Sequence, residues 1–507
     1  MQIKKNTFIL FFLVSLLFKP LWLFNNSNMG IPADDYYHWL HSATIAYDLD
    51  LNYMEDFSLH DATVHPVTNV PSSPPGAGYL SSPFVYFFSF FDKISNQNLN
   101  AIRINPLKSF SVVGYFSAGL FFTLISFNLL NKISKKNSIK TLLLFLTFLS
   151  SLNHYVTTRF LMSHAVEFFL ATTILFIFEN FKNKKINNKL IFSLTLSYFF
   201  LAITRPSTFL YYLILPFAYY KFFKIPNSNK VFLILNTSFL IYLYIFISQK
   251  LYLSNFILLN TYQDDMNAYY DTFTFTQILN GLLKLPNLFL SPSMGILWST
   301  PIVFFGVLCF LNQLLNKNID FSWKFFYSLF FIFSFTPLLV WQGREVAYGQ
   351  RLLIGILPVC FLISSNTLNS NMLTKKSIQF FSFITYTGYL FFYSSEMLTL
   401  RKGVTLWGTN VGYVAQDYYF ELIKGFLDFQ TILSAFLRNI YIVNFFKFFE
   451  IEKFISKFKI LQFFDSKKIE TFINLSYEYS QLKLNYLIAV NLLIFSFSYL
   501  FAKLISK

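Results

Sequence analysis

Long apolar runs separated by short polar segments constrain this chain more than any other feature. The runs lie near residues 6–24, 109–130, 141–158, 161–179, 190–204, 207–223, 231–248, 294–315, 325–341, 352–365, 377–395 and 486–502. A segment inside lipid must satisfy its own backbone hydrogen bonds, so each run is expected to be helical. We predict an all-α polytopic membrane protein with about 12 transmembrane helices, within a range of roughly 11 to 13.

The composition agrees with this class. Only 13% of the residues are charged and 55% are hydrophobic, whereas an ordinary soluble domain is roughly 25% charged. Both cysteines, Cys309 and Cys360, fall inside apolar runs, which excludes a disulfide framework and a paired-cysteine metal site. These features predict a membrane partner and give no reason to expect a nucleic acid.

Lysine placement predicts the orientation. The short loops 131–140, 180–189 and 221–230 each carry at least three lysines, which places them in the cytoplasm. The first run follows Lys4 and Lys5 and ends without a small-residue cleavage site, so it is expected to be a retained helix that begins inside.

Three extracytoplasmic loops follow from this orientation, namely 25–106, 249–292 and 341–351. We assign residues 1–400 to the main transmembrane domain, and residues 401–507 to amphipathic helices with a last transmembrane helix. The run 427–449 is either a further span or an outer-surface helix, and the side of residues 450–484 depends on that choice.

The outer loops carry polar residues where they are costly. Asp34 and Asp35 follow the first span closely, and Trp341–Arg351 interrupts two spans with polar groups. Such positions are functional candidates. His38 and His41 stand three residues apart without a firm third ligand, so no metal site is assigned to them.

Arginines are few and concentrate on the outer side. Five of the seven map to outer ends of spans or outer loops, namely Arg159, Arg205, Arg344, Arg351 and Arg401. The planar guanidinium suits phosphate or carboxylate groups, whereas lysine suits a solvated topology signal. For any single arginine, pairing with an acidic residue or reaching toward the interface is an equally open interpretation.

A resemblance to a known family rests on the order of several segments. Ala33–His38, Asp48–Tyr53, Pro74–Gly76 and Ser82–Phe84 together resemble the first luminal loop of GT-C membrane glycosyltransferases. The most similar group is that of the protein O-mannosyltransferases and lipid A aminoarabinose transferases, in and around glycosyltransferase family 39. Later segments similar to bacterial members are Arg159–Ala165, Ser291–Trp298 and Tyr348–Arg351. The resemblance covers roughly residues 1–360, and Asp35 departs from it because many relatives have glutamate there.

The resemblance implies transfer of a sugar, with inversion, from a polyprenyl-phosphate donor to a lipid, glycan or protein acceptor. The reaction would occur on the extracytoplasmic face of a bacterial inner membrane. Asp34 is carried over as the general base, because a carboxylate close to lipid and beside a second carboxylate holds a proton more tightly. Asp35 would orient the acceptor or help to bind a divalent cation, and both roles stay open.

The leaving phosphate gains negative charge as its bond to the sugar breaks, so fixed positive groups should meet it. The candidates, in order of preference, are Arg351, Arg344, Arg205 and Arg159. Further substrate-binding candidates are His38, His164, Tyr348 and Gln350.

Two other classes are also compatible with parts of the pattern. A polytopic transporter or flippase would place charges at membrane depth, but a secondary transporter should have two similar halves, and no internal repeat is evident. An O-antigen polymerase or ligase would carry outer arginines, but such enzymes lack an acidic pair directly after the first span.

Overall fold

The computed structural model describes a large part of the chain. The described residues are 33–54, 56, 67–71, 73–104, 106, 109–134, 139–181, 187–219, 226–255, 282–283, 289, 296–340, 351–369, 371–382 and 384–385. The predictions for the run 6–24, for the segment 341–350 and for residues 401–507 lie outside these residues.

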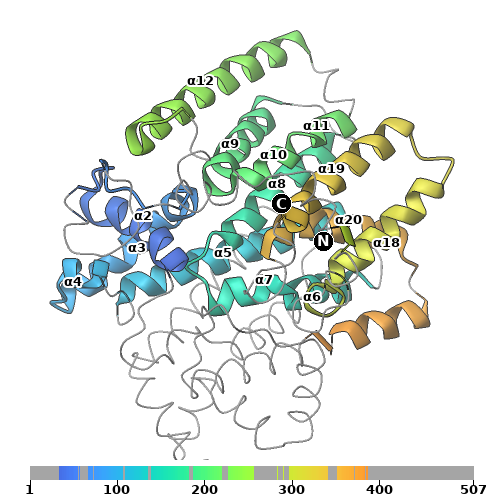
Figure 1. Ribbon diagram of the computed structural model, residues 1–507, viewed down its shortest axis with the longest axis horizontal. Helices are drawn as coiled ribbons and strands as arrows, with labels where there is room; N and C mark the ends of the chain where they lie inside the picture. The colour runs from blue at the N-terminus through green and yellow to red at the C-terminus, as the bar shows by residue number, and fades with distance from the viewer. Residues whose placement is uncertain are drawn as a thin grey trace, which may run out of the picture.

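Every regular element in the described part is a helix, as Figure 1 shows. The elements are α2 (Ala33–Asp48), α3 (Gly76–Ile94), α4 (Leu99–Ile104), α5 (Phe110–Ile133), α6 (Lys140–Leu149), α7 (Ser151–Asn153), η3 (His154–Thr158), α8 (His164–Phe181), α9 (Asn188–Thr204), α10 (Pro206–Tyr212), α11 (Leu215–Ala218), α12 (Asn227–Tyr252), α17 (Ile296–Ser299), α18 (Pro301–Leu315), α19 (Phe321–Val340), η5 (Arg351–Ile356) and α20 (Leu357–Thr367). The all-α class is confirmed for this part of the chain.

Three of the described helices, α5, α8 and α12, are long and apolar enough to cross a membrane. They coincide with three of the predicted runs, and shorter apolar helices such as α6, α9 and α18 coincide with others. The chain is therefore an integral membrane protein. The total of about 12 spans stays a prediction.

The long helices differ in their surroundings. In the most apolar stretch of α5, 89% of the residues are buried inside the protein, against 17% in α12. α5 and α8 form the centre, where Phe122 stacks on Phe169 with 4.9 Å between ring centroids. α12 packs on α9 at the edge of the molecule (Figure 1). Its exposed apolar face suits lipid.

Two apolar runs are interrupted by helix breaks that carry arginines. The run 141–158 divides into α6, α7 and the π-helical η3, and Arg159 follows directly. α9 ends at Thr204, and Pro206 opens α10 as its first residue, so Arg205 stands in the break. Irregular backbone at membrane depth is tolerated where protein surrounds it, and π-helical turns often occur at functional sites.

The Pro-Pro-Gly segment, Pro74–Gly76, leads straight into α3, which begins at Gly76. A Cβ atom at Gly76 would lie 2.3 Å from Thr204 Oγ1, and one at Gly78 would lie 2.5 Å from His41 Cβ. The two glycines therefore let α3 approach the end of α9 and the middle of α2. This close packing holds α3 against both α9 and α2.

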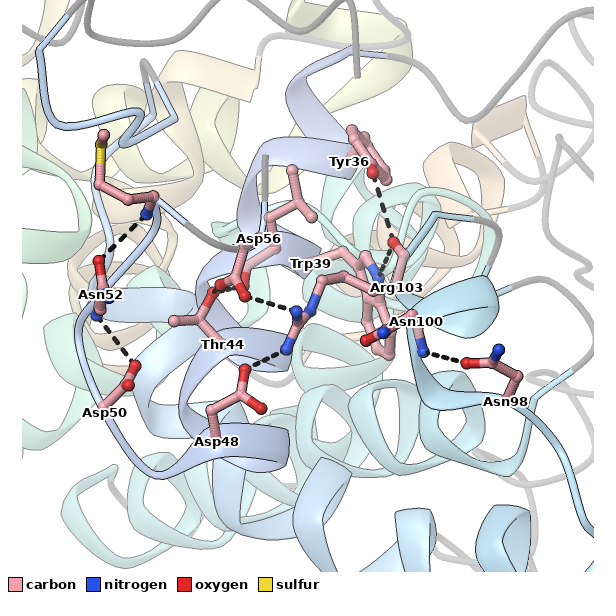
Figure 2. Close-up of polar contacts among 12 residues, drawn as sticks. Tyr36, Trp39, Thr44, Asp48, Asp50, Asn52, Asp56, Asn98, Asn100 and Arg103 are labelled. Carbon is pink, nitrogen blue, oxygen red and sulfur yellow. Dashed lines mark hydrogen bonds and ion pairs between the residues drawn. The ribbon is translucent and has the colours of Figure 1, made fainter. Parts of the chain in front are cut away.

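Arg103 fastens α2 at two points (Figure 2). Its guanidinium forms ion pairs with Asp48 and with Asp56, the latter at 2.5 Å between Nη1 and Oδ1. Its backbone carbonyl accepts hydrogen bonds from Tyr36 Oη at 3.3 Å and from Trp39 Nε1 at 3.2 Å. One residue of α4 thus holds both the beginning and the end of α2, and we call this set of contacts the Arg103 clamp.

His41 joins α2 to the segment before α3. Its Nε2 lies 2.8 Å from the Ser73 carbonyl, which can only accept, so Nε2 donates and Nδ1 accepts from Tyr53 Oη at 2.7 Å. Burial lowers the pKa of His41 to about 3, which keeps the ring neutral. Tyr252, at the end of α12, donates to the same carbonyl at 2.8 Å. Both ring nitrogens of His41 are engaged within the protein.

Candidate active site

Asp35, the second member of the acidic pair, is fully buried in the first turn of α2 and binds Arg159. Arg159 Nε donates to Asp35 Oδ2 at 2.9 Å, and Nη2 binds the same oxygen. The partners are 124 residues apart, so this contact joins the beginning of α2 to the residue that follows η3. The Asp34 backbone belongs to α2, and its side chain lies outside the described part of the structure.

Aromatic and histidine rings surround the turn that carries Arg159. Tyr155 lies between two histidines, with ring centroids 4.9 Å from His154 and 4.5 Å from His164. The Arg159 amide donates to the His154 carbonyl at 2.8 Å, closing the π-helical turn. The break between η3 and α8 is therefore packed inside the protein.

Glu167 belongs to the site, although it was not among the residues predicted from the sequence. It is fully buried in α8, and its carboxylate takes contacts from three elements. His164 Nδ1 lies 2.9 Å from Oε2, and Thr208 Oγ1 donates to Oε1 at 2.5 Å. The Gly355 backbone in η5 lies against the same carboxylate, since a Cβ atom there would be 2.9 Å from Oε1. A carboxylate inside an otherwise apolar run is the sequence signal that would have found it.

Arg205 lies beside this carboxylate without hydrogen-bonding to it. Its Nε is 3.8 Å from Glu167 Oε2, and 12% of its side chain is exposed. Within the described residues, the Arg205 guanidinium makes no side-chain hydrogen bond. The pair is held by charge alone.

The element η5 brings the end of the third outer loop to the same place. Arg351 is its first residue and is half-buried. A Cβ atom at Gly355 would lie 2.3 Å from Tyr211 Oη and 2.9 Å from Glu167 Oε1. Tyr212 Oη donates to the Gly355 carbonyl at 2.8 Å, which fixes the turn from the other side. Only glycine fits so close to the carboxylate.

The structure brings several predicted residues into two neighbouring groups. Asp35 and Arg159 form one, and His164 and Arg205 meet through Glu167 in the other. His38 is buried within α2, while Arg344, Tyr348 and Gln350 lie outside the described residues. The roles assigned to these residues from the sequence stay predictions.

The described residues contain no side-chain cluster that would support metal binding. Among those residues, no three His, Cys, Asp or Glu side chains come together as a metal site would need. One oxygen of Asp35 already accepts from Arg159. The divalent cation considered for Asp35 stays a prediction.

Two carboxylate–arginine pairs lie at breaks in apolar runs, one joined to the outer loop and the other to η5. A guanidinium with unused donors suits phosphate oxygens, because it offers parallel charge-assisted hydrogen bonds. Arg205 meets that condition in the described structure.

No protein-family model and no curated protein sequence matches this chain. Two solved structures from Archaeoglobus fulgidus are similar to it. One is the oligosaccharyltransferase in its apo form, with a TM-score of 0.44, 12% identity, and 93% of this chain and 60% of that chain covered. The other is the oligosaccharyltransferase AglB with an inhibitory peptide and a dolichol-phosphate, with a TM-score of 0.43, 13% identity, and 92% and 59% covered. This chain thus spans under two thirds of their length, and similarity at this level establishes no common activity.

Proposed function

We propose that this protein is a membrane glycosyltransferase of the GT-C type. It would move a sugar from a polyprenyl-phosphate donor to an acceptor on the extracytoplasmic face, with inversion at the anomeric carbon. The reaction class comes from the sequence resemblance. The geometry of the described residues supports the proposal.

The contact that carries the proposal is the buried pair between Asp35 and Arg159. It ties the acidic pair of the first loop to the break in the span ahead of α8. The second charged group, around Glu167 and Arg205, begins at His164, the first residue of α8 after that break. A base and a phosphate-binding group must lie within reach of one phosphosugar, and this contact brings their elements together.

The proposed chemistry uses Asp34 and the arginines. The Asp34 carboxylate takes the proton of the acceptor hydroxyl or amine as that atom attacks the anomeric carbon. The bond between that carbon and the phosphate oxygen breaks, and its electron pair leaves with the polyprenyl phosphate. Arg205 and Arg351 stabilise the added negative charge. Attack opposite the leaving group inverts the configuration.

The direct test measures polyprenyl phosphate released by the purified full-length chain in nanodiscs. A panel of polyprenyl-phosphate sugars serves as donor, and a cell-envelope extract serves as acceptor. Acceptor-dependent release by the wild type, lost in Asp34→Asn, is expected. A parallel assay in sealed vesicles follows movement of the same donors across the bilayer. Movement without any release would refute the transferase and favour a flippase.

A further inference from the structure

Glu167 is a buried carboxylate to which the proposed reaction gives no direct part. We infer that Glu167 is a positioning residue that holds Arg205 and balances its charge, leaving the guanidinium donors for the phosphate of a lipid-linked donor. This inference rests on the proposed function, because it assumes that Arg205 meets a phosphate group.

The carboxylate itself is fixed before Arg205 is considered. Thr208 donates to one oxygen at 2.5 Å, and His164 contacts the other at 2.9 Å. Gly355 lies against the same carboxylate and leaves no room for a larger residue. Contacts from α8, α10 and η5 therefore hold the negative charge in one place.

Arg205 receives charge compensation from this carboxylate but no hydrogen bond. The distance of 3.8 Å between Nε and Oε2 exceeds the roughly 2.7–3.2 Å of an N–H···O bond. A charge buried near lipid needs a counter-charge, and an oppositely charged group about 4 Å away supplies one. The donors of the guanidinium stay uncommitted within the described structure. This state suits reversible capture of an anion.

The direction in which Glu167→Gln changes phosphate binding distinguishes a positioning role from simple proximity. If Glu167 were only a negative charge near the phosphate, Glu167→Gln would remove a repulsion and tighten binding. If Glu167 positions Arg205, the same change lets the guanidinium shift, and binding weakens. We expect weakening of roughly ten-fold, the scale of one charge-assisted hydrogen bond.

The experiment measures binding of polyprenyl phosphate to the full-length protein in nanodiscs, with thermal unfolding recorded for every variant. The set comprises the wild type, Glu167→Gln, Arg205→Gln and the double variant. Because Glu167 acts through Arg205, Glu167→Gln should add little once Arg205 has been replaced. Independent effects that simply add would overturn the inference.

Glu179 provides a matched control on the same helix. Its carboxylate accepts a hydrogen bond from Tyr219 Oη at 2.5 Å, as Glu167 accepts one from Thr208. Glu179→Gln should leave binding unchanged. If Glu167→Gln does not fold, Thr208→Val tests the same point, because it loosens the carboxylate and keeps its charge. We then expect binding weakened several-fold, roughly the effect of one lost hydrogen bond, and unchanged binding would contradict the inference.

The two hypotheses fail in different ways. A wild-type protein that binds no polyprenyl phosphate defeats the proposed function, and the inference with it. A wild type that binds, together with tighter binding in Glu167→Gln, defeats only the positioning role.

Discussion

The two buried carboxylate–arginine pairs differ in how their partners meet. Asp35 and Arg159 are joined by direct hydrogen bonds, one of them 2.9 Å long. Glu167 and Arg205 stand 3.8 Å apart, and the Glu167 carboxylate takes its hydrogen bonds from other groups. The first geometry fastens two segments of chain. The second leaves the Arg205 donors without a hydrogen-bond partner among the described residues, so the two pairs are suited to different roles.

The first outer loop repeats the fastening pattern. The Arg103 guanidinium binds two carboxylates, and His41 uses both ring nitrogens within the protein. Burial raises the pKa of Asp56, while the hydrogen bond from Thr44 and the charge of Arg103 lower it. These polar groups thus bind partners within the same region. We call the described residues from α2 to α4 the platform. Substitutions there should mainly change stability, whereas substitutions around Arg205 should change ligand binding.

The largest effect is expected at Asp34, the proposed base, whose backbone belongs to α2. Asp34→Asn keeps the size of the side chain but cannot accept a proton, so turnover should fall by about two to four orders of magnitude. Donor affinity should stay close to that of the wild type. Asp35→Asn should have a milder effect on turnover and a larger one on stability. Initial rates of sugar transfer and unfolding midpoints of both variants check this division, and equal rates in the wild type and both variants would reject a carboxylate base.

The fastening role of the first pair predicts a large loss of stability. Arg159→Gln leaves Asp35 buried without its counter-charge, which should cost about 3–5 kcal/mol. Adding Asp35→Asn should restore part of that loss, because no charge then remains buried. Denaturant unfolding of the detergent-solubilised protein measures both changes. An Arg159→Gln variant as stable as the wild type, but deficient in donor binding, would instead assign Arg159 to the phosphate.

Much of the fold could be predicted from apolar runs, because helices in lipid are set by local hydrogen bonding. The positions of α5, α8 and α12 followed from that rule. The breaks did not, since η3 and the step from α9 to α10 depend on what packs around them. Pro206 was the one local sign of a break next to Arg205.

The site was harder to predict, because its contacts join distant parts of the chain. The acidic pair and the predicted outer arginines stood out because charged side chains are energetically unfavourable near lipid. However, nothing in the sequence paired Asp35 with Arg159 rather than with another arginine. Glu167 was passed over because its neighbours make a convincing span. Its role depends on Thr208 and Gly355, which no spacing rule connects.

The second pair predicts a change in binding rather than in stability. Arg205→Lys keeps the charge beside Glu167 but loses the planar fork, so donor affinity should fall roughly ten-fold. The unfolding midpoint should move little, because no hydrogen bond joins the partners. Binding of polyprenyl phosphate and thermal unfolding are measured on the same preparation. The reverse result, lost stability with normal affinity, would make Arg205 a second fastening residue and erase the difference between the pairs.

The smallest effect concerns how rigid the platform is as the pH falls. The folded pKa of His41, about 3, lies below the roughly 6.5 of an unfolded histidine. The unfolded state therefore binds more protons between these values, so stability is complete above about pH 6.5 and declines as the pH falls toward 3.

Between pH 6.5 and 5.5 the loss attributable to His41 should be about 1 kcal/mol. Protection factors from hydrogen exchange, which correct for the slower intrinsic exchange at lower pH, should fall in the segment 67–75 over this interval, because protonated Nδ1 can no longer accept from Tyr53. His41→Gln removes the titrating group, so protection of this segment should no longer change with pH. Tyr53→Phe keeps the histidine, so protection should change with pH as it does in the wild type. If protection changes equally with pH in His41→Gln and in the wild type, a group other than His41 causes the pH dependence. The rigidity of the platform would then depend on the Arg103 clamp.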